Sequence, residues 1–194
     1  RADFSRMLEL LAATWHGAPN SLRASMLSGV ALFLKTYGAQ LNDHAFIKRL
    51  SIATPEDIIR ASRVAYGFDF CPGFWDIVRQ GFESGVLTSH KMVFDEIKRG
   101  GDGLWDWLSE IPKACFPDAT GEEFEVYLAM QEWAKGRDYR RQALERFGAD
   151  DYADPWVCAK AKVRELVLVT EEVSAPQSKR DVKIPDVCDA FGVA

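Results

Sequence analysis

The sequence predicts an α/β fold in which a small parallel sheet is flanked by helices and preceded by a helical N-terminal segment. Three observations predict it. Residues 166–170 form an apolar, β-branched run of strand length. A helical segment that opens at Asp154-Pro155 comes directly before this run, and helix followed by buried strand is typical of parallel sheets. Residues 1–63, in contrast, have helical periodicity.

The N-terminal segment carries repeated helix signals. Its apolar residues recur at helical spacing, and turn-forming residues separate the periodic stretches. The strongest start is Thr54-Pro55-Glu56-Asp57, with Thr at the cap, Pro at the first position and acids in the first turn. Residues 1–57 are therefore assigned to a helical segment and residues 58–194 to a second domain. Helices are expected over residues 7–15, 22–37, 42–50 and from 54 onward.

The second domain alternates helix and strand signals. It opens with an aromatic loop at residues 66–75, whose Gly and Pro residues interrupt regular structure. Short apolar runs predict strands at residues 86–88 and 166–170 and a weaker strand at residues 183–185. Helical patterns cover residues 75–85, 90–97, 104–108, 122–134, 139–147 and 154–161.

The composition restricts the classes of function. The chain has 194 residues, 47% of them hydrophobic and 27% charged, which is typical of a soluble globular protein. The formal net charge of -5 argues against a broadly basic, nucleic-acid-coating protein but permits local binding. No apolar run is long enough to span a membrane. Four widely spaced cysteines lack zinc-ligand spacing and are expected to be free thiols, buried or partly buried, in a reducing cytoplasm: Cys71, Cys115, Cys158 and Cys188.

Three acids stand out by their positions. Glu96 lies in a helix among apolar neighbours, Asp154 lies at a helix N-terminus, and Glu172, next to Glu171, follows the apolar run 166–170. Ligands in open α/β sheets gather beyond the carboxyl ends of the strands, which favours a functional role for Glu172. Each acid also has an ordinary explanation: a solvated helix residue, an N-cap and a solvated loop residue, respectively. Their spacing alone leaves both explanations open.

Five segments, taken in their order along the chain, favour the functional role of these acids over the ordinary explanations. Over about residues 58–194, they resemble a bacterial and archaeal branch of the PIN-like family, which is related to the toxin ribonucleases of toxin–antitoxin pairs. The segments are residues 66–76 (YGFDFCPGFWD), 93–97 (VFDEI), 153–157 (ADPWV), 169–176 (VTEEVSAP) and 183–188 (KIPDVC).

The resemblance implies a PIN-like α/β/α sandwich with a central parallel sheet and a metal-dependent ribonuclease activity. It places the family's second, third and fourth acids on Glu96, Asp154 and Glu172, which would bind Mg²⁺ or Mn²⁺ and hydrolyse RNA. Such hard cations take carboxylate oxygens, lower the pKa of a bound water and offset the charge of the phosphate. Asp186 and Lys183 are possible accessory residues at the edge of this site.

The chain departs from the family pattern at the first acid. Family members carry an Asp at the end of their first strand, and its place is taken here by Thr54, within a helix start. The usual first strand and first ligand are therefore expected to be missing, with Glu56 or Asp57 as the only candidate replacements. Residues 21–61 resemble the helical tail of ParB-like proteins, although ordinary helix packing explains them equally well. A mosaic gene joined near Ile59 accounts for both observations.

Three functions remain open from the sequence. The first is a toxin-like, metal-dependent ribonuclease with an antitoxin-type protein partner, and the second is a catalytically degenerate PIN-like module that binds nucleic acid or protein. The third is a DNA-binding protein of a mobile element. Basic residues at 135–141 form either a solvated helix face or phosphate contacts, whereas Lys179, Arg180 and Lys183, closer to the proposed site, are better phosphate candidates.

Overall fold

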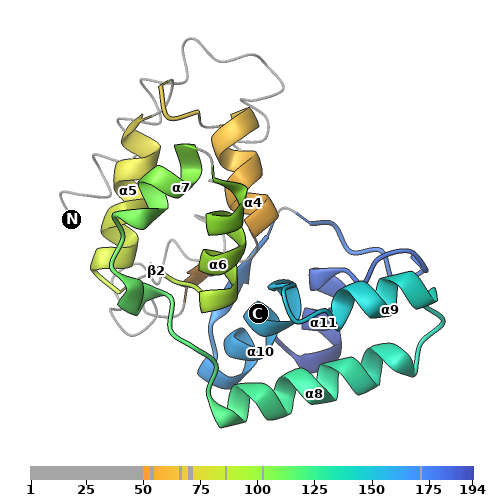
Figure 1. Ribbon diagram of the computed structural model, residues 1–194. Helices are drawn as coiled ribbons and strands as arrows, with labels where there is room; N and C mark the ends of the chain where they lie inside the picture. Colours follow the sequence, from red (N-terminus) through yellow and green to blue (C-terminus); the bar gives the residue numbers. More distant parts are fainter. Residues whose placement is uncertain are drawn as a thin grey trace.

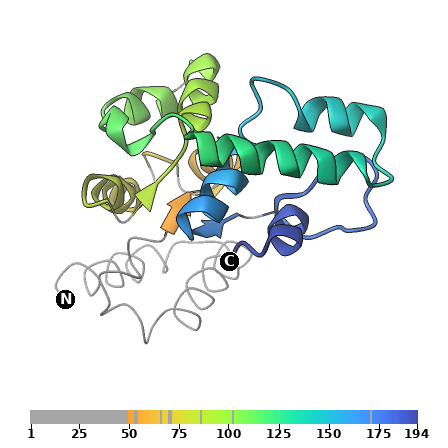
Figure 2. The same ribbon diagram turned by 90° about the horizontal axis from the view of Figure 1, so that it is seen from below.

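The computed structural model describes residues 50–52, 55–65, 67–69, 72–85, 87–101, 103–170 and 172–194. These residues form a predominantly helical structure, shown in two views in Figure 1 and Figure 2. The α-helices are α4 (Pro55–Arg60), α5 (Pro72–Glu83), α6 (Lys91–Gly100), α7 (Gly103–Ser109), α8 (Gly121–Lys135), α9 (Arg141–Phe147), α10 (Asp154–Arg164) and α11 (Ile184–Phe191). A π-helical turn, η1 (Ala61–Ala65), extends α4, and a 3₁₀ turn, η2 (Lys113–Cys115), follows α7.

Three very short strands lie between the helices. Strand β1 (Leu50–Ile52) pairs in parallel with both β2 (Leu87–Thr88) and β3 (Val167–Val169), in the order β2-β1-β3. Leu50 is opposite Leu87 on one side and Val167 on the other. Because all three strands run in the same direction, their carboxyl ends lie at the same edge.

The predicted α/β/α sandwich is wrong. Extended structure among the described residues is limited to strands of two or three residues. These strands are too short to form the central sheet layer of a sandwich. The run at 166–170 forms only β3, because its partner β1 is three residues long and pairs with Val167, Leu168 and Val169 alone. The weak strand predicted at 183–185 is instead the beginning of α11, where Pro185 takes a first-turn position that needs no backbone N–H.

The expectation that the first strand is missing is also wrong. β1 lies just before the helix start at Thr54 and occupies the central position between the other two strands. The third N-terminal helix was expected to reach Leu50, which is the first residue of this strand. The start of α4 at Pro55 is confirmed. The helices expected over residues 7–15 and 22–37 lie outside the described part of the chain.

Two hydrophobic clusters form the interior, and α10 takes part in both. The first joins α4 to α7, with Trp75 and Trp107 in edge contact at 4.8 Å between ring centroids. The second joins α8 to α11. On α10, Val157 packs into the first cluster and the next residue, Cys158, into the second. Figure 1 accordingly shows α4–α7 as one group and α8–α11 as another.

Side-chain caps fix two of the helix starts that border the strands and α10. The Nδ1 atom of His90 accepts the backbone N–H of Met92 at the start of α6. At the start of α8, Thr120 and Glu123 accept each other's backbone N–H groups in a capping box. Glu123 is almost fully buried and also accepts a hydrogen bond from Arg164 of α10, which ties the two helices together.

Candidate functional site

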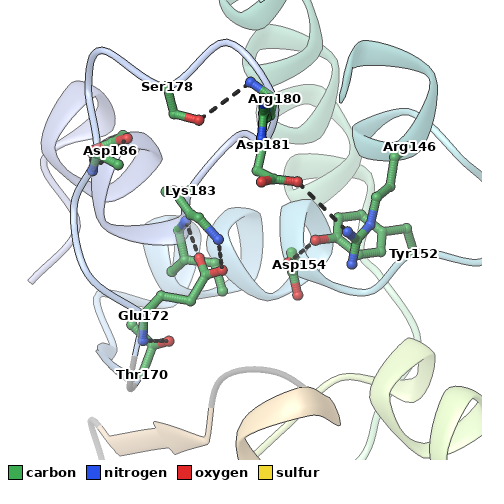
Figure 3. A network of polar contacts seen from close by, with 12 residues as sticks. Arg146, Tyr152, Asp154, Thr170, Glu172, Ser178, Arg180, Asp181, Lys183 and Asp186 are labelled. Carbon is green, nitrogen blue, oxygen red and sulfur yellow. Dashed lines mark hydrogen bonds and ion pairs between the residues drawn. The ribbon is translucent and has the colours of Figure 1, made fainter. Parts of the chain in front are cut away.

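A pocket of about 230 Å³ lies between α9, the start of α10 and the loop that leads into α11. Three residues that the sequence singled out, Asp154, Glu172 and Lys183, line it together. Figure 3 shows their polar contacts. The residues from separate parts of the chain therefore converge on one cavity, whose lining is Ala143, Arg146, Phe147, Tyr152, Asp154, Glu172, Asp181, Val182 and Lys183.

Asp154 presents a buried carboxylate to this pocket. It is the first residue of α10 and is only 2% exposed. The ordinary explanation, an N-cap, does not hold, because Ala153 is the cap residue and no side chain makes a capping bond there. Instead, the hydroxyl of Tyr152 donates to Oδ2 of Asp154. Burial of a carboxylate is energetically unfavourable, so the buried position of Asp154 favours a functional role over a purely structural one.

Glu172 connects the end of β3 to the start of α11. Its Oε1 accepts a hydrogen bond from Lys183 Nζ at 2.8 Å, and its Oε2 accepts the backbone N–H of Ile184 at 2.9 Å. The carboxylate thus caps α11 from another segment of the chain, where the helix dipole favours a negative charge. The hydrogen bond from Lys183 to Glu172 raises the pKa of the lysine, so Lys183 stays charged. Glu171 lies outside the described residues.

The remaining predicted site residues are not in the lining of this pocket. Glu96 is half-buried on α6, a helix of the other group, although α6 packs against α4 just after β1. Asp186 is buried in the first turn of α11, where it accepts hydrogen bonds from the Ser174 hydroxyl at 2.6 Å and the Ala175 N–H. Asp186 therefore holds the loop before α11. The side chains of Glu56 and Asp57, the candidate replacements, lie outside the described residues.

Three polar residues of the pocket, Arg146, Tyr152 and Asp181, were not predicted from the sequence. The guanidinium of Arg146 lies over the ring of Tyr152, 4.9 Å from its centroid, and 3.8 Å from a carboxylate oxygen of Asp181. Tyr152 in turn orients Asp154, so these side chains form a continuous polar wall. The position of Tyr152, two residues before the acid that opens α10, was the available signal. Nothing in the sequence around Arg146 separates it from the other basic residues of α9.

The carboxylates of the pocket do not form a complete metal cage. In the parts of the chain that the structure describes, no group of three or more His, Cys, Asp or Glu side chains is arranged to hold a metal ion. Asp154 and Glu172 are the two predicted ligands that share the pocket. Two cations, Arg146 and Lys183, line it as well, so both signs of charge meet there.

A second group of buried polar residues lies where β2 meets α10. The ammonium of Lys160, 4% exposed, donates to the backbone carbonyl of Ser89 and to Thr88 Oγ1 at 3.3 Å. Burial lowers the pKa of Lys160 to about 8. The neighbouring His90 is 3% exposed, and burial, reinforced by the charge of Lys160, lowers its pKa to about 4. This group ties the strand edge to α10 and is not part of the lining of the pocket beside Asp154.

The cysteine prediction holds for the described residues. Cys115, Cys158 and Cys188 are free thiols, the last two of them buried, and Cys71 lies outside the described residues. Cys158 donates a hydrogen bond to Cys188, which lowers the pKa of Cys188 and raises that of Cys158. None of the described helices is long and apolar enough to cross a membrane.

Comparison with protein families gives two matches. Residues 55–194 match the model of a domain of unknown function, DUF4411, and residues 3–76 match that of a family of unknown function, DUF6551. The two matches overlap over residues 55–76, which include α4. No curated protein and no solved structure is significantly similar to the chain. Neither family description names an activity, so the resemblance to PIN-like nucleases stays a prediction.

Proposed function

The chain belongs to the DUF4411 family over residues 55–194, and we propose that this domain is a cytoplasmic, metal-dependent nuclease that hydrolyses single-stranded RNA. One observation carries the proposal: Asp154 and Glu172, distant in sequence, line one pocket together with Arg146 and Lys183. A phosphodiester substrate needs carboxylates to hold a divalent cation and basic groups to hold the phosphate. Both kinds of group face the same cavity here.

The two carboxylates suit Mg²⁺ or Mn²⁺ better than a cation that needs a complete protein cage. Mg²⁺ keeps several waters and is commonly held by one or two carboxylates together with substrate phosphates. Asp154 and Glu172 provide that number, and the burial of Asp154 favours a cation beside it. When bound, the metal would lower the pKa of a water and offset charge on the phosphate. The order of the five sequence segments supports the same class of reaction.

The chain's own residues have distinct tasks in this proposal. Tyr152 holds Oδ2 of Asp154 in place, which keeps its carboxylate aimed at the pocket. Lys183, which is 29% exposed and paired with Glu172, can exchange that carboxylate for a substrate phosphate, which frees Glu172 Oε1. Arg146 lies over Tyr152 on the opposite wall and provides a second cation for the same phosphate. The backbone N–H of Ile184 continues to hold Glu172 Oε2.

Cleavage of a labelled single-stranded RNA by the full chain in Mn²⁺ tests the proposal. We expect Asp154→Asn to lower the rate by about a hundredfold or more, because the buried carboxylate is lost while its shape is kept. Asp118→Asn is the matched control, since Asp118 is exposed and pairs with Lys91 far from the pocket. Circular dichroism checks that both variants fold. Equal rates for wild type and Asp154→Asn would remove the assignment.

A second function is a binding module without hydrolysis. The hydrogen bonds of Glu172 favour it, because Lys183 and the Ile184 N–H already donate to both carboxylate oxygens. A metal ion would have to compete with these donors. Calorimetric titration with Mn²⁺ separates the two functions. Binding that is lost in Asp154→Asn supports the nuclease, whereas no heat at millimolar Mn²⁺, combined with tight binding of RNA, supports the binding module.

A further inference from the structure

We propose that the turn between α8 and α9 and the loop over residues 178–183 form one basic surface that binds the backbone of single-stranded RNA beside the pocket. The inference rests on the proposed function, since the surface would deliver the strand to that site. It assigns the substrate contacts to Arg140 and Arg180 in particular.

The two segments are joined directly, although they are distant in sequence. The backbone N–H of Arg140 donates to the carbonyl of Lys179 at 2.7 Å, and the ammonium of Lys179 pairs with Asp138. Closer to the pocket, Arg146 of α9 lies 3.8 Å from Asp181 of the loop. Figure 3 shows Arg180, Asp181 and Arg146 in succession above Asp154. The surface and the pocket are therefore continuous.

Positive charge is concentrated here in a chain whose net charge is -5. Within residues 135–146 and 178–183 the acids are Asp138, Glu145 and Asp181, and they are outnumbered by basic residues. The basic residues are Lys135, Arg137, Arg140, Arg141, Arg146, Lys179, Arg180 and Lys183. An isolated positive patch on an acidic protein is the expected footprint of a polyanion that binds locally.

Most of these cations already have a partner, so they would have to exchange it to bind a ligand, and two others would not. Lys135 pairs with Glu132, Arg141 with Glu145, Lys179 with Asp138 and Arg146 with Asp181. Arg137 packs over the ring of Trp133 at 4.4 Å. The side chains of Arg140 and Arg180 are exposed and make no ion pair or hydrogen bond with any described residue. Their guanidinium groups are therefore available to an anionic ligand.

A flexible polyanion fits this arrangement better than a compact acidic ligand. The arginines lie on two segments that lead toward Arg146 and Lys183, so successive phosphates can be bound along one path. Guanidinium groups make two parallel bonds to a phosphate, which suits Arg140 and Arg180. A single strand can bend into the pocket, whereas a duplex would have to open first.

Fluorescence anisotropy with a labelled single-stranded RNA of twelve nucleotides tests the surface, with the full chain in EDTA so that no cleavage occurs. We expect Arg140→Gln combined with Arg180→Gln to weaken binding about tenfold or more. The slope of log K against log salt should fall by about 1.4, since each lost single-strand phosphate contact removes about 0.7. The Arg140–Lys179 backbone bond survives both changes.

Lys98→Gln combined with Lys113→Gln is the control, because it removes the same charge from exposed positions on α6 and η2. We expect less than a twofold change. Equal losses in the two double variants would overturn the surface, as would wild-type binding weaker than millimolar. Preferential binding of an acidic peptide or of duplex RNA would overturn it as well.

The RNA-binding surface and the nuclease activity can be tested independently of each other. Hydrolysis of a small phosphodiester, bis(p-nitrophenyl) phosphate, in Mn²⁺ reports on the pocket alone and needs no strand contact. Loss of RNA binding in the arginine variant with unchanged turnover of the small substrate supports the surface. Unchanged RNA binding together with Asp154-dependent turnover refutes the surface and keeps the nuclease.

Discussion

Acidification from pH 7 to pH 5 should weaken the folded state through one residue, His90. Its ring is buried, stacks on Trp156 with the centroids 5.6 Å apart, and accepts the N–H of Met92 on Nδ1. The second proton of an imidazolium would have to occupy the Nδ1 position at which the Met92 N–H points. Protonation would therefore break the cap of α6 and place a charge near Lys160, so both geometry and burial oppose it.

The size of the effect follows from the pKa. Burial lowers the pKa of His90 from its ordinary value of 6.5 to about 4. Between these values the unfolded chain binds a proton that the folded chain does not, so stability falls as the pH falls from 6.5 toward 4. Each pKa unit corresponds to about 1.36 kcal/mol, which gives about 2 kcal/mol at pH 5 and about 3 kcal/mol at pH 4.

Urea unfolding followed by tryptophan fluorescence measures this loss at pH 7 and pH 5. His90→Asn is the comparison, because Asn can accept the same N–H as a helix cap but does not titrate. We expect wild type to lose about 2 kcal/mol more than His90→Asn between the two pH values, since all other titrating groups are common to both. Losses that agree within about 0.5 kcal/mol would show that His90 is already protonated in the fold or accessible to water, and would refute the reasoning.

Three substitutions test local features that stabilise the fold. Gly81→Ala on α5 should destabilise the fold by about 1–3 kcal/mol, because a Cβ there would lie 2.7 Å from Cγ of Leu87 on β2. Glu165→Gly should be more stable than Glu165→Ala by about 1 kcal/mol, since φ is 51° at this position. Glu123→Gln should cost about 1–2 kcal/mol, because it weakens the buried hydrogen bonds to Thr120 and Arg164. Thermal and urea unfolding measure all three.

Matched outcomes can contradict each of these expectations. Gly100→Ala is the control for Gly81, since no atom would meet its Cβ within 4 Å, and equal effects of the two changes would exclude a steric cause. A more stable Glu165→Ala than Glu165→Gly would mean that the backbone there is unstrained. A Glu123→Gln protein as stable as wild type would show that the charge of Glu123 contributes nothing to its two bonds.

The sequence predicted the local elements better than the architecture. Caps and periodicity are local properties, so the start of α4 at Pro55 and the strand run before Glu172 were both predictable. The sandwich was wrong because strand length depends on tertiary pairing. The run 166–170 pairs only over Val167–Val169, because its partner β1 is itself three residues long. β1 was missed because its pattern is too short to stand out from the helical residues around it.

The pocket was only partly predictable for a similar reason. Asp154, Glu172 and Lys183 were recognised from segment order, and the fold brings all three to one cavity. Arg146 could not be recognised as a site residue, because only its tertiary contact with the ring of Tyr152 separates it from the other basic residues of α9. Glu96 and Asp186 show the reverse case, in which a residue type suited to metal binding lies outside the lining of the cavity.

The two-sided burial of α10 has a consequence for how the protein can be divided. Val157 faces one interior and Cys158 the other, so neither group of helices is closed without this helix. If the chain were cut between η2 and α8, the N-terminal fragment would lack α10, which completes its hydrophobic cluster. The C-terminal fragment would expose the side of α10 that carries Val157. The orientation of Asp154, at the tip of the same helix, is likewise sensitive to packing defects on either side. Trp75 belongs to the same hydrophobic cluster as Val157, so a substitution at Trp75 is expected to affect Asp154 through α10.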